Sequence, residues 1–342
     1  MSAGRILHGL GAVRRAPHRA VVTIGMFDGV HVAHQRVLRS TVALARRIGG
    51  TSVAITFDPD PQTVLDPSHP HASLMPIAER INHVRALGVE WVWVIPFTTR
   101  FARVSANAFV RRILVGTLHA DALVVGEGFL FGRARRGDLD VLERLGSRHG
   151  MRVVPVRRVI RGGAPVSSSR IRRLISAGRL AAATRLLGRA PALYGVVVPG
   201  AGRGCSLGAP TANLRMTSGA LPPHGVYAVR VYDMATHDRR GATPPPLSVR
   251  STRTAAERPL ACGKEIGGGV MNLGVRPTFG AGPVVCEVHL LDFRSTLLGH
   301  PVRLSLILRL RSERCFPSLH ALTTQIQRDI VRARRILRAR AL

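Results

Sequence analysis

Lysine is almost absent from this chain: Lys264 is the only one among 50 basic residues, and the others are arginine. Acidic residues are also few, 19 in all, and the formal net charge is +31. Aromatic residues make up only 4%, so the chain lacks the basic stripe interleaved with aromatics of a dedicated nucleic-acid surface. The charge still predicts non-specific, salt-sensitive adhesion to nucleic acid. A basic nucleic-acid-associated protein therefore remains the alternative to an enzyme.

Cysteines and long apolar runs are scarce as well. The four cysteines show no C-x-x-C spacing, which argues against a structural zinc site or a disulfide framework. This usage is compatible with a reducing compartment, so we expect a cytoplasmic protein. No uncharged apolar run reaches the ~18 residues of a membrane helix, and we expect no membrane partner. The sequence leaves a homo-oligomer open.

The length of 342 residues allows a sizeable core and predicts two domains. In the first half, apolar runs alternate with helical patterns. The expected strands are 20–27, 51–57, 91–96, 122–125 and 153–156, and the expected helices are 34–48, 76–87, 105–118 and 141–148. Unbroken apolar strands indicate burial on both faces, as in a parallel sheet. Residues 1–188 are therefore predicted to form a doubly wound α/β domain, with its ligand at the carboxyl ends of the strands.

The second half has a different pattern. Two helical segments, 167–177 and 180–187, are followed by a predicted boundary near residue 189. Short alternating strands then follow at 194–198, 227–232, 270–273, 286–293 and 302–311. They predict a small antiparallel β-barrel over residues 189–342. A last helix, with Ser318 as its N-cap, should pack on the barrel. The polar, proline-rich insert 233–267 is expected to be a long mobile loop.

Two histidines directly follow a glycine-bearing turn after the first of these strands. His31 and His34 open the next helix, whose N-terminus offers unpaired N–H groups and a positive dipole end to phosphate. The imidazoles would add further donors. Surface histidines or half a metal site are the alternatives. The order strand, turn, helix favours binding of a nucleotide phosphate.

Residues 27–35, FDGVHVAHQ, resemble the FDGVHxGHQ signature of the bacterial bifunctional riboflavin kinase/FAD synthetase family, whose N-terminal half is an HxGH nucleotidyltransferase. Residues 56–61, 124–132 and 167–172 resemble the family's TFxPHP, VVGxDFxFG and SSTxIR motifs. The resemblance implies that His31, His34 and Arg172 are catalytic in adenylyl transfer. It further implies nucleotide and phosphate contacts by Gly25, Phe27, Asp28, Gly126, Ser168 and Ser169.

Three positions depart from these motifs. Ala33 replaces a glycine where the backbone passes close to the nucleotide, and Gly128 removes a polar side chain near the expected site. Asp60 stands where a histidine is usual. These departures leave open a working kinase with a weakened adenylyltransferase.

The barrel region carries a second set of motifs. Residues 195–213 resemble the riboflavin kinase GxPTAN region with its glycine-rich turn, in which backbone amides approach phosphates closely. The resemblance implies that Thr211 and Asn213 supply oxygen ligands for Mg²⁺. The nucleotide contacts implied by the resemblance are Gly202, Gly204, Gly208 and Pro210.

Two further segments, 269–279 and 311–316, resemble the family's GVxNxGxxPTF and RxExxF. They imply flavin contacts by Asn272, Arg311, Glu313 and Phe316. Glu287 matches the glutamate that family members use as general base on the ribityl 5′-hydroxyl; a solvent-facing barrel glutamate is the alternative.

The resemblance as a whole implies two steps of FAD formation. The C-terminal barrel would phosphorylate riboflavin to FMN with ATP and Mg²⁺. The N-terminal domain would adenylylate FMN to FAD and release diphosphate. Riboflavin, FMN and ATP are thus the expected small-molecule partners, and FMN and FAD the products.

Overall fold

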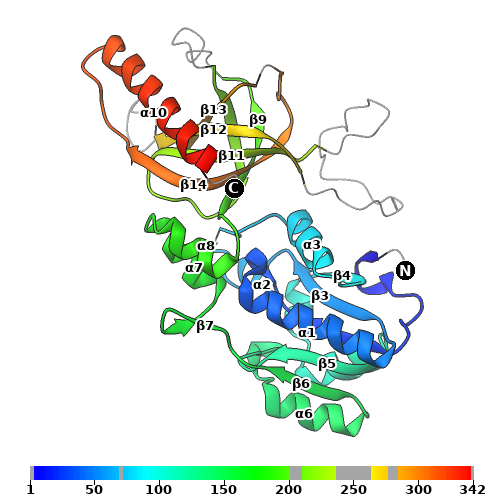
Figure 1. Ribbon diagram of the computed structural model, residues 1–342. Coiled ribbons are helices and arrows are strands. Elements are labelled where there is room, and N and C mark those ends of the chain that lie inside the picture. The colour runs from blue at the N-terminus through cyan, green and yellow to red at the C-terminus, as the bar shows by residue number, and fades with distance from the viewer. Residues whose placement is uncertain are drawn as a thin grey trace. The chain divides into compact units, whose positions relative to one another are not determined.

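The computed structural model describes residues 4–68, 72–200, 210–235, 263–275, 284–293 and 295–339. The chain forms two compact units (Figure 1): residues 1–71 with 77–167, and residues 72–76 with 168–342. Compactness thus groups residues 168–188 with the barrel, whereas the sequence pattern predicts a boundary near residue 189. Within the described part of the chain, no helix has the length and apolar character needed to span a membrane.

The first unit is built on a six-stranded parallel sheet in the order β1-β4-β3-β2-β5-β6. Its strands are β1 (Arg5–His8), β2 (Ala20–Ile24), β3 (Ser52–Asp58), β4 (Trp91–Pro96), β5 (Ala120–Gly126) and β6 (Arg152–Val156). All five residues of β2 are buried, as its unbroken apolar run predicts. The strand order changes direction beside β2, with β3 on one side and β5 on the other.

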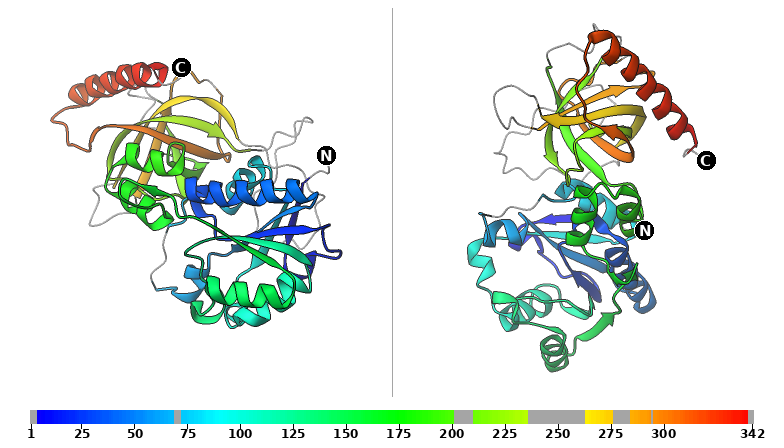
Figure 2. Two further views of the ribbon diagram at one scale, coloured as in Figure 1. Left: turned by 60° about the horizontal axis from the view of Figure 1, so that its bottom comes forward. Right: turned by 90° about the vertical axis from the view of Figure 1, so that its left-hand side faces the viewer.

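Helices cover both faces of this sheet (Figure 2). They are α1 (Val32–Ile48), α2 (Pro61–Leu65), α3 (Ile77–Ala86), α4 (Thr99–Ala102), α5 (Ala106–Phe109) and α6 (Leu139–Arg148). Short turns are η1 (Leu10–Ala12), η2 (Asp28–Val30), η3 (Val110–Val115) and η4 (Arg133–Arg135), and β7 (Ile160–Arg161) pairs with β8 (Ala164–Pro165). One core cluster joins α1 to β2 and β5, and another joins η3 and α6 to the opposite face. The predicted doubly wound α/β fold is confirmed.

Two elements of this unit differ from the sequence-based expectation. β1 is an edge strand of four residues with only Ile6 buried, so it carries no apolar run that would reveal it. The helix expected over 105–118 is divided into α5 and the π-helical turn η3. The wider turn brings Val110, Ile113 and Leu114 into the core together.

The second unit contains a closed antiparallel barrel in the order β10-β13-β12-β11-β14-β9. Its strands are β9 (Ala192–Val198), β10 (Ala212–Ser218), β11 (Gly225–Asp233), β12 (Lys264–Val275), β13 (Val284–Leu290) and β14 (Pro301–Ser312). Its helices are α7 (Ser168–Ser176), α8 (Leu180–Leu187) and α10 (Leu319–Ala339). The predicted barrel is confirmed. Most of the expected insert, residues 236–262, lies outside the described residues.

Helix α10 packs along the outside of the barrel (Figure 1). Ile330, Ala333 and Leu337 are buried against Val226 and Ala228 of β11. Ser318 caps the helix as expected, because its Oγ accepts the amide N–H of Ala321 at 3.1 Å. This cap replaces a bond that the first turn of a helix cannot make within itself.

Candidate functional site

The histidine motif lies where the strand order of the parallel sheet changes direction. β2 and β5 are neighbours there, with Thr23 opposite Val124, so Gly25 and Gly126 follow at the same edge. In open α/β sheets, ligands bind at this carboxyl edge beside such a switch point. The ends of β2 and β5 thus place Gly25 and Gly126, two of the residues predicted to contact the nucleotide, at one edge of the sheet.

The turn between β2 and α1 is tightly packed. Phe27 is buried and has a left-handed φ of 50°. A Cβ added at Gly25 would lie 2.9 Å from the Phe27 ring, so glycine is required beside it. Asp28 is 2% exposed and opens η2. Phe27 and Asp28 therefore shape the turn that presents the histidines.

His31 is the N-cap of α1. Its Nδ1 accepts the backbone N–H of His34 at 3.3 Å. In the neutral ring, this bond leaves the proton on Nε2. The two imidazoles stack with ring centroids 3.6 Å apart, and Phe27 meets His34 edge-on at 5.4 Å. The two predicted catalytic histidines are therefore packed directly against each other.

The environment keeps His34 neutral. Burial, followed by the charges of His31 and Arg80, lowers the pKa of His34 well below its ordinary 6.5. Its Nδ1 is buried and finds no hydrogen-bond partner among the described residues. A neutral imidazole can take part in hydrogen bonds but carries no net charge.

Arg80 is a residue of this region that the motifs did not reveal. It is 4% exposed, and its Nη1 donates to the carbonyl of Phe57 at 3.2 Å. Burial lowers the pKa of Arg80, while Asp28 and then Asp60 act in the opposite direction. Its Nε is buried without a partner in the described structure. The signal in the sequence was an arginine on the apolar face of the helix expected over 76–87.

Ser168, Ser169 and Arg172 lie on α7, in the second compact unit. Ser168 is the first residue of the helix, and Ser169 follows it in the first turn. The Arg172 Nε donates to the carbonyl of Ala72 at 2.8 Å. The serines therefore stand at a helix N-terminus, where orphan amides favour an anion.

The three departures from the family motifs have different structural surroundings. Ala33 lies in the first turn of α1 and is half-buried. Asp60 caps α2, accepting the amide N–H of Gln62 at 2.9 Å. A Cβ added at Gly128 would lie 2.8 Å from Nη2 of Arg158, so a guanidinium group covers this glycine.

The barrel register aligns four of the predicted kinase residues. Asn213 of β10 lies opposite Glu287 of β13, and Glu287 lies opposite Asn272 of β12. The same row continues through Val226 of β11 to Arg311 of β14. Directly opposite residues project to one face of a sheet, about 5 Å apart at Cβ. Segments distant in sequence thus form one continuous row.

This row lies on the outer face of the barrel. The neighbours of Glu287 along β13, Cys286 and Val288, are 0% and 1% exposed. Because side chains alternate along a strand, Glu287 points outward. Burial, and then the charge of Glu287, raises the pKa of Cys286 to about 12, so its thiol stays protonated. Glu287 faces outward as the alternative interpretation requires, but it lies between two asparagines.

Two glycines make room for side chains of the row and of the loop after it. A Cβ added at Gly200 would overlap the amide of Asn213, whose Nδ2 is the nearest atom. A Cβ added at Gly274 would overlap the Glu313 carboxylate. Both glycines therefore permit close approach of a polar side chain to the backbone.

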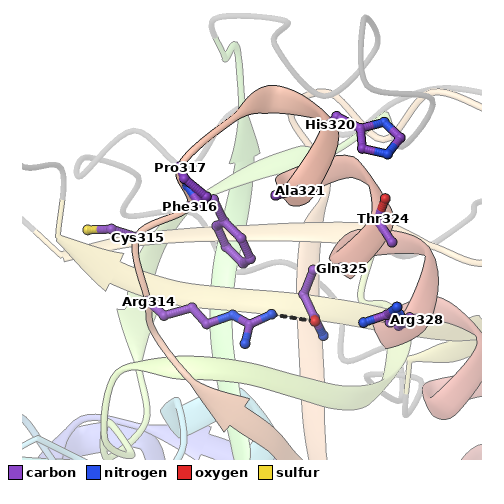
Figure 3. Close-up of a pocket in the computed structure, with 9 residues that line it drawn as sticks. All are labelled: Arg314, Cys315, Phe316, Pro317, His320, Ala321, Thr324, Gln325 and Arg328. Carbon is purple, nitrogen blue, oxygen red and sulfur yellow. Dashed lines mark hydrogen bonds between the residues drawn. The ribbon is translucent and has the colours of Figure 1, made fainter.

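A pocket of about 450 Å³ lies between the loop that follows β14 and the start of α10 (Figure 3). It is lined by Arg314, Cys315, Phe316, Pro317, His320, Ala321, Thr324, Gln325 and Arg328. The Arg314 guanidinium lies 4.7 Å from the Phe316 ring centroid, and that of Arg311 lies 5.5 Å from it. The predicted flavin residue Phe316 therefore lines a concave site with an aromatic and cationic wall.

A buried carboxylate ties this pocket to the barrel. Asp329 of α10 accepts Arg311 Nε through Oδ2 at 2.8 Å and Gln325 Nε2 through Oδ1 at 2.8 Å. Gln325 in turn accepts Arg314 Nη2 at 2.5 Å, as Figure 3 shows. Asp329 is 4% exposed. It was not identified from the sequence, because a lone aspartate in a basic helix gives no motif.

Some predicted nucleotide contacts fall elsewhere. Gly202, Gly204 and Gly208 lie outside the described residues. Pro210 and Thr211 directly precede β10, and the Pro210 carbonyl lies 2.9 Å from Nδ1 of His289. Thr211 thus stands beside the start of the row that contains Asn213.

Two family models match the chain: FAD synthetase over residues 13–170 and Riboflavin kinase over residues 187–337. The bifunctional riboflavin kinase/FMN adenylyltransferase of Escherichia coli strain K12 is 32% identical over 96% of this chain and 97% of its own length. That of Pseudomonas fluorescens is 35% identical with the same coverage. A crystal structure described as a macrolide-efflux protein from Streptococcus pneumoniae is 27% identical and superposes with a TM-score of 0.76, over 94% of this chain and 95% of that one. The family predicted from the motifs is confirmed: the chain belongs to the bifunctional riboflavin kinases/FMN adenylyltransferases.

Proposed function

We propose that the chain makes FAD from riboflavin in two steps. The barrel phosphorylates riboflavin to FMN with ATP, and the α/β unit adenylylates FMN to FAD with release of diphosphate. The observation that carries this proposal is the row Asn213, Glu287 and Asn272 across three neighbouring strands. It joins the residues that three separate kinase motifs supply.

In the kinase step, Glu287 accepts the proton of the ribityl 5′-hydroxyl while the hydroxyl oxygen attacks the γ-phosphorus of ATP. The bond from that phosphorus to the bridging oxygen breaks, and ADP leaves. A general base must lie within hydrogen-bond reach of the proton it takes. Glu287 lies on the outer face of β13 and is half-buried, so its carboxylate is not enclosed in the barrel core. Asn213 and Asn272, on either side, limit where the hydroxyl can bind.

The donor set beside Glu287 suits a magnesium ion. Among the described residues, no group of three or more His, Cys, Asp and Glu side chains could hold a metal. Mg²⁺, however, is usually held by one or two protein oxygens together with water and substrate phosphates. Asn213 offers an amide oxygen and Thr211 a hydroxyl oxygen, which are the ligand types that Mg²⁺ prefers. Asn213 and Thr211 would hold the ion, which would neutralise charge on the transferred phosphoryl group.

The Phe316 pocket is the proposed place for the flavin ring. Its volume of about 450 Å³ lies within the range of small-molecule sites. Phe316 supplies a face for stacking, and Arg314 donates to a carbonyl edge. Arg311 links this wall to the catalytic row, because it is the last member of that row. Glu313, held against Gly274, is the proposed acceptor for polar groups of the flavin.

In the transferase step, catalysis is mainly positioning and charge stabilisation, since no covalent nucleophile is needed. An oxygen of the FMN phosphate attacks the α-phosphorus of ATP, and diphosphate leaves. His31 and the neutral His34 donate to the oxygens on which charge develops. Ser168, Ser169 and Arg172 are the proposed holders of the outgoing phosphates, and Gly25 and Gly126 let the nucleotide approach the sheet edge.

A weakened adenylyltransferase is the second candidate, and one observation favours it. The Arg158 guanidinium lies against Gly128, where the family motif carries an acidic or amide side chain. A cation therefore replaces an acceptor near the nucleotide. We expect FAD formation to be slower than FMN formation in this chain.

Chromatographic separation of flavins tests the proposal. Purified protein is incubated with riboflavin, ATP and Mg²⁺, with an EDTA control, and FMN and FAD are quantified over time. Glu287→Gln should lower FMN formation by ~10²-fold or more yet still convert added FMN to FAD. His31→Asn should form FMN but lose the conversion of FMN to FAD. A parent that forms neither product, or variants that lose both steps together, would contradict two separate catalytic sites for the two steps.

A further inference from the structure

The described residues that precede β10 are held by a side chain of β13. The recorded pairing between the two strands begins with Ala212 opposite Val288. Pro210 lies ahead of that pairing, and its carbonyl oxygen is 2.9 Å from Nδ1 of His289. A carbonyl only accepts, so the imidazole Nδ1 carries the proton in this contact. The ring thus continues the attachment of β10 to β13 beyond the backbone ladder.

His289 projects from the same face as the proposed catalytic base. Val288, the residue between Glu287 and His289, is 1% exposed and points into the barrel. Alternation along the strand then places Glu287 and His289 side by side on the outer face. The ring can therefore reach the segment that carries Thr211 without crossing the barrel core.

The proline makes this contact decisive for the segment. Pro210 has no backbone N–H, so its carbonyl is the backbone group it offers for attachment. Asn213 is fixed by its place in the ladder opposite Glu287. Thr211 precedes the ladder and lies between the held carbonyl of Pro210 and the first paired residue, Ala212. The orientation of its hydroxyl depends on both anchors.

We propose that His289 is a positioning residue of the kinase, which holds Pro210 so that Thr211 and Asn213 together present two oxygens to the magnesium ion of Mg·ATP. The inference rests on the proposed kinase function. Residues that orient metal ligands from behind affect metal affinity about 10–100-fold when they are changed. His289 itself stays out of the reaction, because its donor is used by Pro210.

The test compares His289→Phe, which keeps a flat ring without a donor, with His289→Asn, whose amide N–H can take the place of Nδ1–H. ADP binding is measured calorimetrically with Mg²⁺ and with EDTA, and FMN formation is followed over a Mg²⁺ titration. We expect the Mg²⁺ concentration for half-saturation to rise about tenfold in His289→Phe and to stay within about threefold of the parent in His289→Asn. ADP binding in EDTA and the KM for riboflavin should stay at parent values.

Three results would overturn the inference. The first is a Mg²⁺ concentration for half-saturation in His289→Phe that equals the parent's. The second is an equal rise of that concentration in His289→Phe and His289→Asn. The third is a weakening of riboflavin binding as large as the rise in the Mg²⁺ requirement. The variant Asn213→Ala separates the role of His289 from the proposed magnesium site itself. If that variant leaves the Mg²⁺ dependence unchanged, the assignment of the metal site fails. If it shifts the dependence and His289→Phe does not, only the role of His289 fails.

Discussion

The Asp329 carboxylate should matter more to stability than an equally close ion pair on the surface. Asp329 has a side chain 6% exposed and accepts two donors, and its partner Arg311 is 19% exposed. Asp329→Ala leaves the Arg311 guanidinium and the Gln325 amide without this acceptor. Breaking a buried pair from one side costs ~3–5 kcal/mol, and the partial hydration of Arg311 favours the lower end. At about 2–4 °C per kcal/mol, the melting temperature of the barrel unit should fall by ~6–12 °C.

The matched control is Asp292, which pairs with Arg334 through two hydrogen bonds of 2.5 and 2.9 Å. These bonds lower the pKa of Asp292, but its side chain is 72% exposed. Water can replace the partner there, so Asp292→Asn should leave the melting temperature unchanged. Each carboxylate accepts two hydrogen bonds, at least one of them from an arginine, so the comparison of Asp329→Asn with Asp292→Asn tests the effect of burial.

Calorimetry and riboflavin kinetics together check this reasoning. Asp329→Asn keeps the shape but has only one acceptor oxygen for two donors, so its cost should be ~1–2 kcal/mol, between parent and Asp329→Ala. The KM for riboflavin should rise in the same order, because Arg311 and Gln325 fix the wall of the Phe316 pocket. If Asp329→Ala lowers the melting temperature no more than Asp292→Asn does, the buried network does not stabilise the unit.

Four further outcomes are expected. Glu287→Gln should lower FMN formation by ~10²-fold or more at an unchanged melting temperature. FMN formation at the parent rate would refute the role of Glu287 as general base. His34 has a lowered pKa in the folded state and an ordinary pKa of 6.5 in the unfolded state. Its contribution to the free energy of unfolding is therefore present above pH 6.5 and is lost as the pH falls below that value, by at most about 1.4 kcal/mol per pH unit. Urea unfolding at pH 7 and 5.5 should show a smaller pH effect in His34→Asn than in the parent. Apart from its chain neighbours, no atom of the described residues would lie within 4 Å of a Cβ at Gly126. Gly126→Ala should therefore keep the melting temperature while FAD formation falls about tenfold through crowding of the nucleotide. An unchanged rate of FAD formation would place the nucleotide elsewhere. With a net charge of +31, retention on DNA should disappear by ~0.5 M salt, and sequence-selective retention at that salt would favour a nucleic-acid role.

Local patterns in the sequence were sufficient for the elements with continuous apolar runs. β2 is buried along its whole length, and α8 occupies the interval expected from its period, ending at the left-handed Gly188. β10 was not among the expected strands, because its alternation is weak and Leu214 is its only fully buried residue. The last helix was expected to pack on the barrel, yet Leu319, its first residue, is 72% exposed.

The candidate site shows the same division. Motifs identified Glu287 and Asn213 individually, but their direct opposition follows from strand pairing between segments more than seventy residues apart, which no local pattern contains. Arg80 and Asp329 were missed for another reason. Both are charged residues that composition assigns to the surface, and only packing shows that they are buried.

The alternation along β13 ties catalysis to correct folding. Cys286 and Glu287 are neighbours in the chain, yet Cys286 belongs to the barrel interior and Glu287 to the proposed catalytic row on the outer face. A shift of the strand by one residue would send the carboxylate into the apolar interior and the thiol to the substrate side. Such a misregistered barrel would therefore be both unstable and inactive, so a chain that has folded into the closed barrel already presents its base on the correct side. Deletion of one residue within β13 should abolish both the yield of soluble folded protein and the kinase activity. Deletion of one residue in an exposed turn should leave both unchanged.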